Sequence, residues 1–461
     1  MPSLATSKRL GLSETLARFC EEFSFKQLPN PVVEQTKNVV LDTLGAMLAA
    51  SSPKYPTAMK LVKLVRSLGG RPESTVIGYT LKTSVTNASL VNGTFGYYCD
   101  IEPHHVDAIL HGPASTIPAA LAVGETTAVN GKTFIASVIL GIDIGARISL
   151  GLTPTGQYNR GFHPSAVCGA FGAAAAAGKI LGLKSGEMVN SLGLAALQAS
   201  GLLSWESDRT EMSRPLNLGI AARNGVTAAL LAKQGYAGPE VFESKYDVFN
   251  AFSGQSDCDR MTLLLGEDFE MMKLAYKRYS CCAFLHPGLD AMLKILQENN
   301  ISSEEISEIR LRFPSTGAKL IDNASLKSHN AQFAMATVAS KGTITIDDIL
   351  RDSRTVRVEE LAKKIIVVHD NELADLFPKK YTSIVELTTN DGRQYKERID
   401  FAYGTPQNPM SKDEIVKKFR FLTGKVLSKQ KANQVIETVM RLERIPDIRS
   451  LISMLRIRNT P

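Results

Sequence analysis

The chain has 461 residues, more than one ordinary domain core accommodates, so its length favours two domains. With 44% hydrophobic, 21% charged and 7% aromatic residues, its composition excludes a disordered or fibrous chain. The net charge of +7 comes from dispersed Lys and Arg residues without the interleaved aromatics of a nucleic-acid groove. We therefore expect no nucleic acid and a small anionic partner, although a merely solubilising surface charge would give the same balance.

Membrane and secretory signals are not evident in the sequence. The two longest apolar tracts, residues 133–150 and 167–183, fall short of the roughly 20 apolar residues of a membrane span, because charged residues interrupt both. The first residues do not form a secretory signal, and six irregularly spaced cysteines do not form a disulfide framework. We expect no membrane partner and a reducing, cytoplasmic location, with a mitochondrial one left open.

Helical periodicity dominates the first part of the chain, from residue 13 to about 265. Apolar residues recur at helical spacing in residues 31–51, where Pro31 occupies a first-turn position. Further helices, close-packed and buried on nearly all sides, are predicted for Ala- and Gly-rich segments at residues 133–150, 165–183 and 219–235. This part of the chain is expected to be all-α.

Strand patterns appear later in the chain. Residues 306–313 alternate between apolar and polar side chains, as in a half-buried strand. Residues 383–388 and 394–399 flank Asn390-Asp391-Gly392, which is a strong hairpin signal because such residues accept positive φ. A sheet containing one hairpin is therefore predicted.

Domain boundaries follow from this change of pattern. We place the first domain at residues 1–266 and an α+β domain at 267–404, with helices predicted at 331–341 and 358–367. Amphipathic helical patterns then return, and we expect the C-terminal segment 405–461 to complete the first domain. The predicted fold is mainly α, with a large all-α helical domain and a smaller α+β domain.

Candidate chemistry is concentrated in one loop. Three histidines and three carboxylates lie within twelve positions: Asp100, Glu102, His104, His105, Asp107 and His111. Proline and glycine residues interrupt any helix there, which predicts a folded loop in which imidazoles and carboxylates converge. The alternative is a surface loop whose polar groups face water.

Two further polar segments precede predicted helices. His163 stands before an Ala/Gly-rich helix that Ser165 is expected to cap, and the N-terminus of such a helix attracts anions. A structural histidine is the alternative. Arg214 precedes another buried helix and can hold a carboxylate bidentately, although a surface ion pair with Glu211 or Asp208 fits equally well.

The segment from Lys277 to His286 combines basic residues with two adjacent cysteines. No second Cys/His pair has zinc-site spacing, so Cys281 and Cys282 are interpreted as a small buried pair, and no metal or cofactor is expected. Motifs of phosphate-binding loops, dinucleotide-binding folds and nucleophile elbows are missing from the sequence. What remains suits acid/base chemistry on an anionic substrate, with cations stabilising a carbanion or enolate.

Seven segments together resemble the MmgE/PrpD family over essentially the whole chain. They are VVLDTLGAMLA, NGTFGYYCDIE, LHGPASTIPAALA, GFHPSAVCGAFGAAAAAGKILGL, LNLGIAARNG, KRYSCCAFLHPGLDA and HNAQFAMA. The resemblance implies a large all-α domain, a smaller α+β lid domain, a homodimer and a cofactor-free pocket between the domains. It also implies a decarboxylase or dehydratase acting on a small di- or tricarboxylate of the cis-aconitate or 2-methylcitrate type.

The resemblance also assigns site residues. The expected catalytic residues are Asp100, His111, His163 and Lys277, and the expected substrate-binding residues are Arg214, His105, Arg278 and Tyr279. The two histidines would move protons at carbon, and Asp100 would orient one imidazole.

Two departures from the family pattern leave alternatives open. Arg214 stands where many members have lysine, and arginine keeps the positive charge but does not release a proton. Asp100-Ile101-Glu102-Pro103 replaces the paired aspartates that are frequent in the family. An epimerase that removes and returns one proton, and a non-catalytic paralogue, are therefore the alternatives to a lyase.

Overall fold

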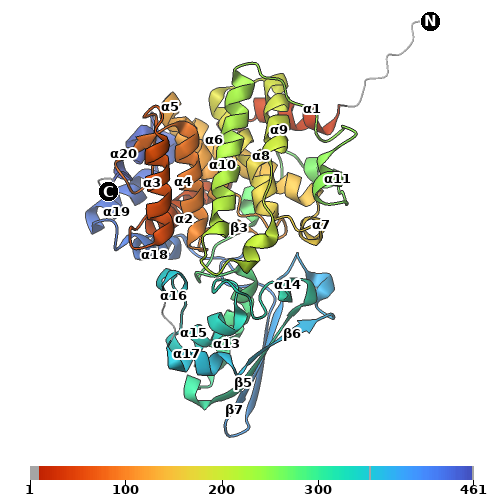
Figure 1. Cartoon of the computed structure of the whole chain (residues 1–461), viewed down its shortest axis with the longest axis vertical. Helices are drawn as coiled ribbons and strands as arrows, with labels where there is room; N and C mark the ends of the chain where they lie inside the picture. Colours follow the sequence, from red (N-terminus) through yellow and green to blue (C-terminus); the bar gives the residue numbers. More distant parts are fainter. Residues whose placement is uncertain (1–9, 352–354, 459–461) are drawn as a thin grey trace, which may run out of the picture.

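A computed structural model describes residues 10–351 and 355–458. The structure is mostly helical with a small sheet, as the sequence predicts (Figure 1). The helices of the first part are α1 (Leu12–Glu22), α2 (Asn30–Ala50), α3 (Pro56–Leu68), α4 (Val85–Tyr98), α5 (Pro113–Thr127), α6 (Gly131–Gly151), α7 (Pro154–Asn159), α8 (Pro164–Leu181), α9 (Ser185–Gln198), α10 (Ser213–Lys233), α11 (Val248–Phe252) and α12 (Asp259–Thr262).

Glycines allow the central helices α4 and α10 to pack with their backbones almost in contact. A Cβ atom on Gly93 of α4 would lie 2.9 Å from the Cα atom of Gly219 of α10. A Cβ atom on Gly219 would lie 2.3 Å from the carbonyl oxygen of Leu90. The two helices run antiparallel, so the C-terminal end of α4 lies beside the N-terminal end of α10.

By length and composition alone, two helices, α6 and α8, could cross a membrane. Their apolar windows are 100% and 83% buried inside the structure, where α8 packs against α5, α6 and α10. Two charged residues in the middle of α6 are buried as a pair, with Arg147 Nε 2.6 Å from Asp143 Oδ2. The two apolar tracts are thus core helices of the structure.

A four-stranded sheet lies below the helical part in Figure 1. Its order is β6 (Ile365–Asp370), β5 (Ile306–Pro314), β7 (Ser383–Thr389) and β8 (Gln394–Ile399). Strand β6 is parallel to β5, and the other pairs are antiparallel. The accompanying helices are α13 (His286–Glu298), α14 (Ser315–Ala318), α15 (Ala331–Lys341), α16 (Ile346–Leu350) and α17 (Val356–Ala362). Helix α13 packs against β7, β8 and α15.

Most of the predicted elements of this region are confirmed, and one is wrong. Strand β5, helix α15 and the hairpin between β7 and β8 lie where the sequence predicts them. The helix predicted at residues 358–367 ends at Ala362, and Ile365–Val367 belong to β6. The β-branched run Ile365-Ile366-Val367-Val368 pairs in parallel with β5, and this long-range pairing outweighs the local helical pattern.

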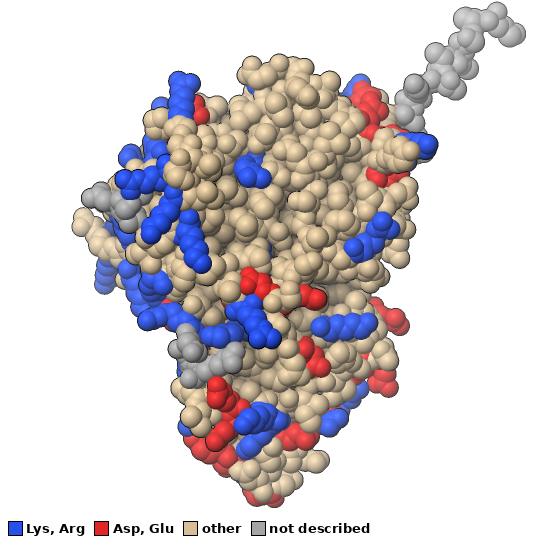
Figure 2. All heavy atoms as spheres, viewed as in Figure 1, with Lys and Arg blue, Asp and Glu red and all other residues tan. Residues whose placement is uncertain are grey.

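The remaining elements connect distant parts of the chain. Helices α18 (Lys412–Thr423) and α19 (Lys429–Met440) pack against α2, and α20 (Arg449–Met454) packs against α5. Lys and Arg side chains gather on this side of the molecule (Figure 2). Short strands interrupt the helical pattern of the first part at β1 (Ser74–Thr75), β2 (Lys82–Thr83) and β3 (His104–His105), and β3 pairs with β4 (Leu274–Ala275).

Candidate active site

Four helix ends meet at the predicted loop. Asp100 follows the C-terminal end of α4, His111 precedes α5, His163 is the N-cap residue of α8 and Arg214 lies in the first turn of α10. Because α5, α8 and α10 all begin here, three helix N-termini add partial positive charge. The close packing of α4 on α10 brings Arg214 to Asp100.

Ser165 has a different role from the cap that the sequence predicts. It lies within the first turn of α8, and its hydroxyl oxygen accepts a hydrogen bond from the backbone N–H of His111 at 3.0 Å. The same hydroxyl donates to the carbonyl oxygen of Ile109 at 3.1 Å. Ser165 therefore ties the loop to α8 and fixes the backbone position of His111.

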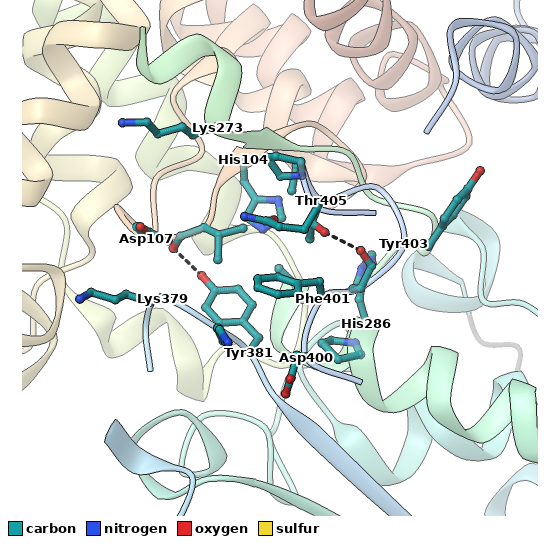
Figure 3. A pocket seen from close by; sticks show the side chains of 18 of the residues that line it. His104, Asp107, Lys273, His286, Lys379, Tyr381, Asp400, Phe401, Tyr403 and Thr405 are labelled. Carbon is teal, nitrogen blue, oxygen red and sulfur yellow. Dashed lines mark hydrogen bonds between the residues drawn. The ribbon is translucent and has the colours of Figure 1, made fainter. Parts of the chain in front are cut away.

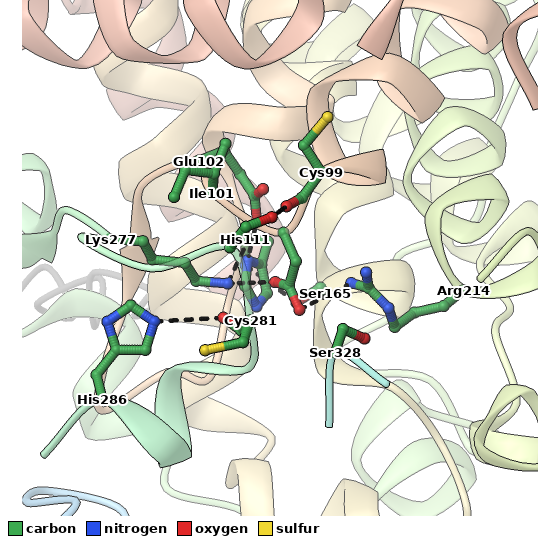
Figure 4. Close-up of polar contacts among 12 residues, drawn as sticks. Cys99, Ile101, Glu102, His111, Ser165, Arg214, Lys277, Cys281, His286 and Ser328 are labelled. Atoms are coloured by element: carbon green, nitrogen blue, oxygen red, sulfur yellow. Dashed lines mark hydrogen bonds and ion pairs between the residues drawn. The ribbon is translucent and has the colours of Figure 1, made fainter. Parts of the chain in front are cut away.

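Asp100 lies between two buried cations. Lys277 Nζ donates a hydrogen bond to Asp100 Oδ1, and Arg214 Nη1 lies 3.6 Å from Asp100 Oδ2. Figure 4 shows Lys277 and Arg214 reaching this centre from opposite sides. The Arg214 guanidinium also stacks over the ring of Tyr97 at 4.3 Å. Burial alone would raise the pKa of Asp100, but the charges of Arg214 and Lys277 lower it, so that Asp100 is ionised.

Glu102 and His111 form a second buried pair. Glu102 Oε1 lies 2.6 Å from His111 Nδ1 and 3.8 Å from Lys277 Nζ. Burial raises the pKa of Glu102 to about 7, with Lys277 opposing and the negative charge of Asp100 adding to the rise. Burial and the charge of Lys277 lower the pKa of His111 well below its usual value. Glu102 therefore titrates near neutral pH, and its proton can pass to His111 along their hydrogen bond.

Three further histidines complete the wall of a small cavity. His104, His163 and His329 are buried, and burial is the first cause that lowers the pKa of each. These imidazoles are thus neutral in the free protein. The cavity has a volume of about 30 Å³, which is room for water but not for a tricarboxylate. Its other aromatic lining residues are Tyr97, Tyr158, Trp205, Phe284 and Tyr381.

Many buried polar atoms at this site have no hydrogen-bond partner among the described residues. They include all three guanidinium nitrogens of Arg214 and the indole nitrogen of Trp205. They also include both ring nitrogens of His104 and Nδ1 of His163. Since an unsatisfied buried polar group costs about 1–3 kcal/mol, such a concentration is typical of a site that a ligand completes.

The structure brings together five of the eight predicted site residues: Asp100, His111, His163, Arg214 and Lys277. The other three lie elsewhere. Both ring nitrogens of His105 are engaged, one with Glu270 Oε2 at 2.8 Å and the other with the N–H of Ala108 at 3.1 Å.

Arg278 and Tyr279 point away from the cavity. The side chain of Arg278 is 47% exposed, with Nη1 3.9 Å from Asp290 Oδ1. The hydroxyl of Tyr279 donates to the same carboxylate at 2.9 Å. Neither residue lines the cavity.

Sequence reasoning did not assign four of the residues that build the site: Glu102, His104, Trp205 and His329. Glu102 and His104 belong to the loop that the sequence singles out, and His329 belongs to the HNAQFAMA segment. Trp205 is the chain's single tryptophan, but no spacing or motif connects it with the other site residues.

One group of side chains has the arrangement of metal ligands. Ligand atoms of Asp100, Glu102 and His111 all lie within 4.8 Å of one another. Lys277, however, hydrogen-bonds Asp100 and lies 3.8 Å from Glu102, so its ammonium already supplies the positive charge there. A divalent ion would have to displace Lys277.

The adjacent cysteines are buried thiols. Cys281 and Cys282 are 0% and 8% exposed, as the interpretation of a small buried pair predicts. Burial raises the pKa of both, to about 12 for Cys282. Neither residue is therefore an activated nucleophile.

The geometry is that of a buried cluster of titratable and cationic groups in a mainly helical protein. The MmgE/PrpD N-terminal domain matches residues 14–261, and the MmgE/PrpD C-terminal domain matches residues 279–444. The chain therefore belongs to the MmgE/PrpD family.

Relatives resemble the chain over nearly its full length. The cis-aconitate decarboxylase of Aspergillus terreus is 26% identical over 482 residues, covering 98% of this chain and 97% of the relative. The cis-aconitate decarboxylase of Homo sapiens is 24% identical over 462 residues, covering 96% and 94%. The family and these names indicate an enzyme.

Proposed function

We propose that this protein is a cofactor-independent lyase that removes a carboxylate, or alternatively water, from a small di- or tricarboxylate of the cis-aconitate or 2-methylcitrate type. The observation that carries the proposal is the set of unpartnered buried donors around neutral imidazoles, above all the guanidinium of Arg214. The names of the relatives favour decarboxylation of cis-aconitate.

Substrate carboxylates would accept hydrogen bonds from the buried donors. Arg214 offers two adjacent N–H groups that match a carboxylate bidentately, and Trp205 Nε1 offers a third donor. The N-termini of α8 and α10 add positive potential. Lys277, whose pKa is raised because the effects of Asp100 and Glu102 exceed that of burial, remains a fixed cation beside the reacting carbon.

The proposed reaction of cis-aconitate balances with one added proton. The C–C bond to the carboxylate on the CH₂ group breaks and releases CO₂. The electron pair moves across the double bond and forms a carbanion-like centre at its far carbon, stabilised as an enolate by the adjacent carboxylate and by the nearby cations. One proton is then added to that carbon, so the trianion becomes a dianion.

The Glu102–His111 pair supplies this proton. With Glu102 protonated, His111 Nε2–H faces the substrate while Nδ1 accepts the proton of Glu102 at 2.6 Å. Transfer of the Nε2 proton to carbon then moves the Glu102 proton onto Nδ1. His163, whose ring lies 6.0 Å from that of Tyr97, stands beside the same centre as a second neutral base.

Substrate access requires movement, because the cavity of about 30 Å³ is too small for such a substrate. We propose that residues 267–404 form an α+β lid domain that opens over the all-α part, residues 1–266 with 405–461. The contacts between the two parts at this site include the hydrogen bonds from Lys277 to Asp100 and from Tyr381 to Val106. We also propose that the protein forms a homodimer, as the family resemblance implies.

The test is proton NMR in deuterated buffer containing a chelator, with cis-aconitate, 2-methylcitrate, citrate and iminodisuccinate supplied separately. A decarboxylated product that carries one solvent deuteron, or a dehydrated product that has lost a proton from carbon and gained no deuteron, is expected from one of them. Deuterium exchange or inversion without loss of CO₂ or water would replace the lyase by an epimerase. Binding without any reaction across the panel would favour the non-catalytic paralogue.

A further inference from the structure

A second, larger pocket lies next to the reaction cavity. It has a volume of about 260 Å³. Figure 3 shows the side chains that line it. Its lining includes His104 and Asp107 from the loop after α4, Lys273 beside β4, and the segment Lys379–Tyr381 that leads into β7. We call it the outer pocket. Unlike the reaction cavity, it has room for a small polycarboxylate.

Three residues separate the two spaces, because His104, Ala283 and Tyr381 line both. The ring of His104 stacks on His111 at 5.5 Å and 24° on one side. It stacks on Tyr381 at 6.5 Å and 14° on the other. The wall is therefore thin, and a shift of these side chains would join the outer pocket to the site of chemistry.

The wall presents polar atoms that nothing in the described chain satisfies. His104 is 5% exposed, and neither of its ring nitrogens has a hydrogen-bond partner there. Its neighbour Tyr381, by contrast, donates its hydroxyl to the carbonyl oxygen of Val106 at 2.8 Å. A buried imidazole without hydrogen-bond partners indicates a ligand that reaches it from the outer pocket or from the reaction cavity.

The charges around the outer pocket favour an anion. Lys273 is already paired with Asp268 at 2.7 Å and with Glu270 at 3.0 Å. Lys379 and Lys380 form no ion pair within the described parts of the chain. Lys380 lies over the ring of Phe401 at 5.2 Å, and its charge helps to lower the pKa of Asp400.

The carboxylates of the outer pocket are largely compensated. Asp400 accepts from Arg398 Nε at 2.9 Å and from the hydroxyl of Thr382 at 3.0 Å. Burial raises the pKa of Asp107, which reduces its tendency to ionise. Lys379 and Lys380 are thus the cations of the outer pocket that form no ion pair within the described residues, although Lys380 also feels the charge of Asp400.

We infer that the outer pocket is a second binding site, in which a small di- or tricarboxylate docks on Lys379 and Lys380 before it passes His104 and Tyr381 into the reaction cavity. This inference rests on the proposed function for the identity of the anion. The site raises the local concentration of substrate at the wall and takes no part in bond breaking.

The kinetic test compares the double variant Lys379→Gln/Lys380→Gln with the matched double variant Lys63→Gln/Lys429→Gln. The control removes the same charge from exposed positions on α3 and α19 that do not line the pocket. We expect kcat/KM of the pocket variant to fall about 5- to 10-fold at low ionic strength with kcat retained, and the difference to shrink in 0.5 M salt. Equal effects in both variants would overturn the inference.

A binding test keeps the inference separate from the proposed reaction. Propane-1,2,3-tricarboxylate is titrated by calorimetry into Arg214→Met, which removes the anchor of the reaction cavity. We expect weak residual binding that is lost when Lys379→Gln/Lys380→Gln is added and kept with the control pair. Residual binding that does not change when Lys379 and Lys380 are replaced would overturn the inferred outer site and leave the proposed lyase activity unaffected. Residual binding that depends on them, combined with a wild-type protein that turns over no substrate, would uphold the outer site and refute the lyase.

Discussion

Replacing Arg214 by methionine should separate ligand binding from folding. The Arg214 side chain is 0% exposed, and its three nitrogens have no hydrogen-bond partner among the described residues. Its ionic contacts are long, 3.6 Å to Asp100 and 3.9 Å to Glu211. Methionine fills a similar volume without leaving donors unsatisfied. Asp100 keeps its hydrogen bond from Lys277, and Glu211 keeps its hydrogen bonds from Ser328, so both buried carboxylates retain donors.

The two expected effects differ strongly in size. Breaking a buried ion pair typically costs about 3–5 kcal/mol, but here the loss is offset by removal of the unsatisfied guanidinium, so we expect the free energy of unfolding to change by less than about 1.5 kcal/mol. Loss of a bidentate charge-assisted contact to a substrate carboxylate should cost about 3 kcal/mol in binding. That corresponds to an increase of about 150-fold in Kd.

Calorimetric titration with propane-1,2,3-tricarboxylate and urea unfolding of the same preparation measure both quantities. Arg214→Lys is the matched control, since it keeps the charge but not the fork geometry, and it should bind with intermediate affinity. Wild-type affinity in Arg214→Met would refute the assignment of Arg214 as a carboxylate anchor. A large loss of stability would show instead that Arg214 acts mainly on the fold.

Three further outcomes are expected. Since the protonated form of Glu102 is required and burial raises its pKa to about 7, kcat/KM should fall as the pH rises above about 7. Glu102→Gln should lower kcat by about 100-fold and abolish this fall in kcat/KM at high pH. A fall in kcat/KM that survives in the variant would contradict the assignment of Glu102. Carboxylates bound beside His111 and His163 should raise the low pKa values of these imidazoles, so the protein should take up protons when it binds a ligand near pH 6. Calorimetry would detect this uptake as a binding enthalpy that varies with the ionisation enthalpy of the buffer. Gly219→Ala should destabilise the protein by about 1–3 kcal/mol in urea unfolding, because its Cβ atom would lie 2.1 Å from Thr94 Oγ1, whereas Gly186→Ala, which meets nothing within 4 Å, should not.

Local patterns were enough to predict the elements whose pairing is local. The hairpin around Asn390-Asp391-Gly392 is specified by its own turn residues, and β7 and β8 pair across it. Strand β6 was predicted as the end of a helix because nothing near Ile365 reveals its partner. That partner is Ile309 of β5, 56 positions earlier in the chain. A parallel pairing of this kind is invisible to periodicity.

The same distinction applies to the site. Chemistry that is dense in sequence, as in the loop from Asp100 to His111, could be located before any geometry was known. The direction in which each side chain points could not be predicted from the sequence. His104 and His105 are adjacent, yet successive residues of β3 point to opposite sides, so His104 lines the cavity while His105 is bound to Glu270.

The charge balance of the site supports the proposed anionic substrate. Asp100 is ionised and faces both Arg214 and Lys277, while Glu102, with a pKa raised to about 7, is close to half protonated at neutral pH. The surrounding histidines are neutral, because burial first and nearby positive charges second lower the pKa values of their imidazoles. In the proposed complex, a bound carboxylate neutralises the excess positive charge and so raises the pKa values of the imidazoles. The imidazoles thereby become better proton acceptors when the reaction transfers protons. The substrate thus contributes to its own acid/base catalysis, and an uncharged amide analogue should lose proton uptake as well as affinity.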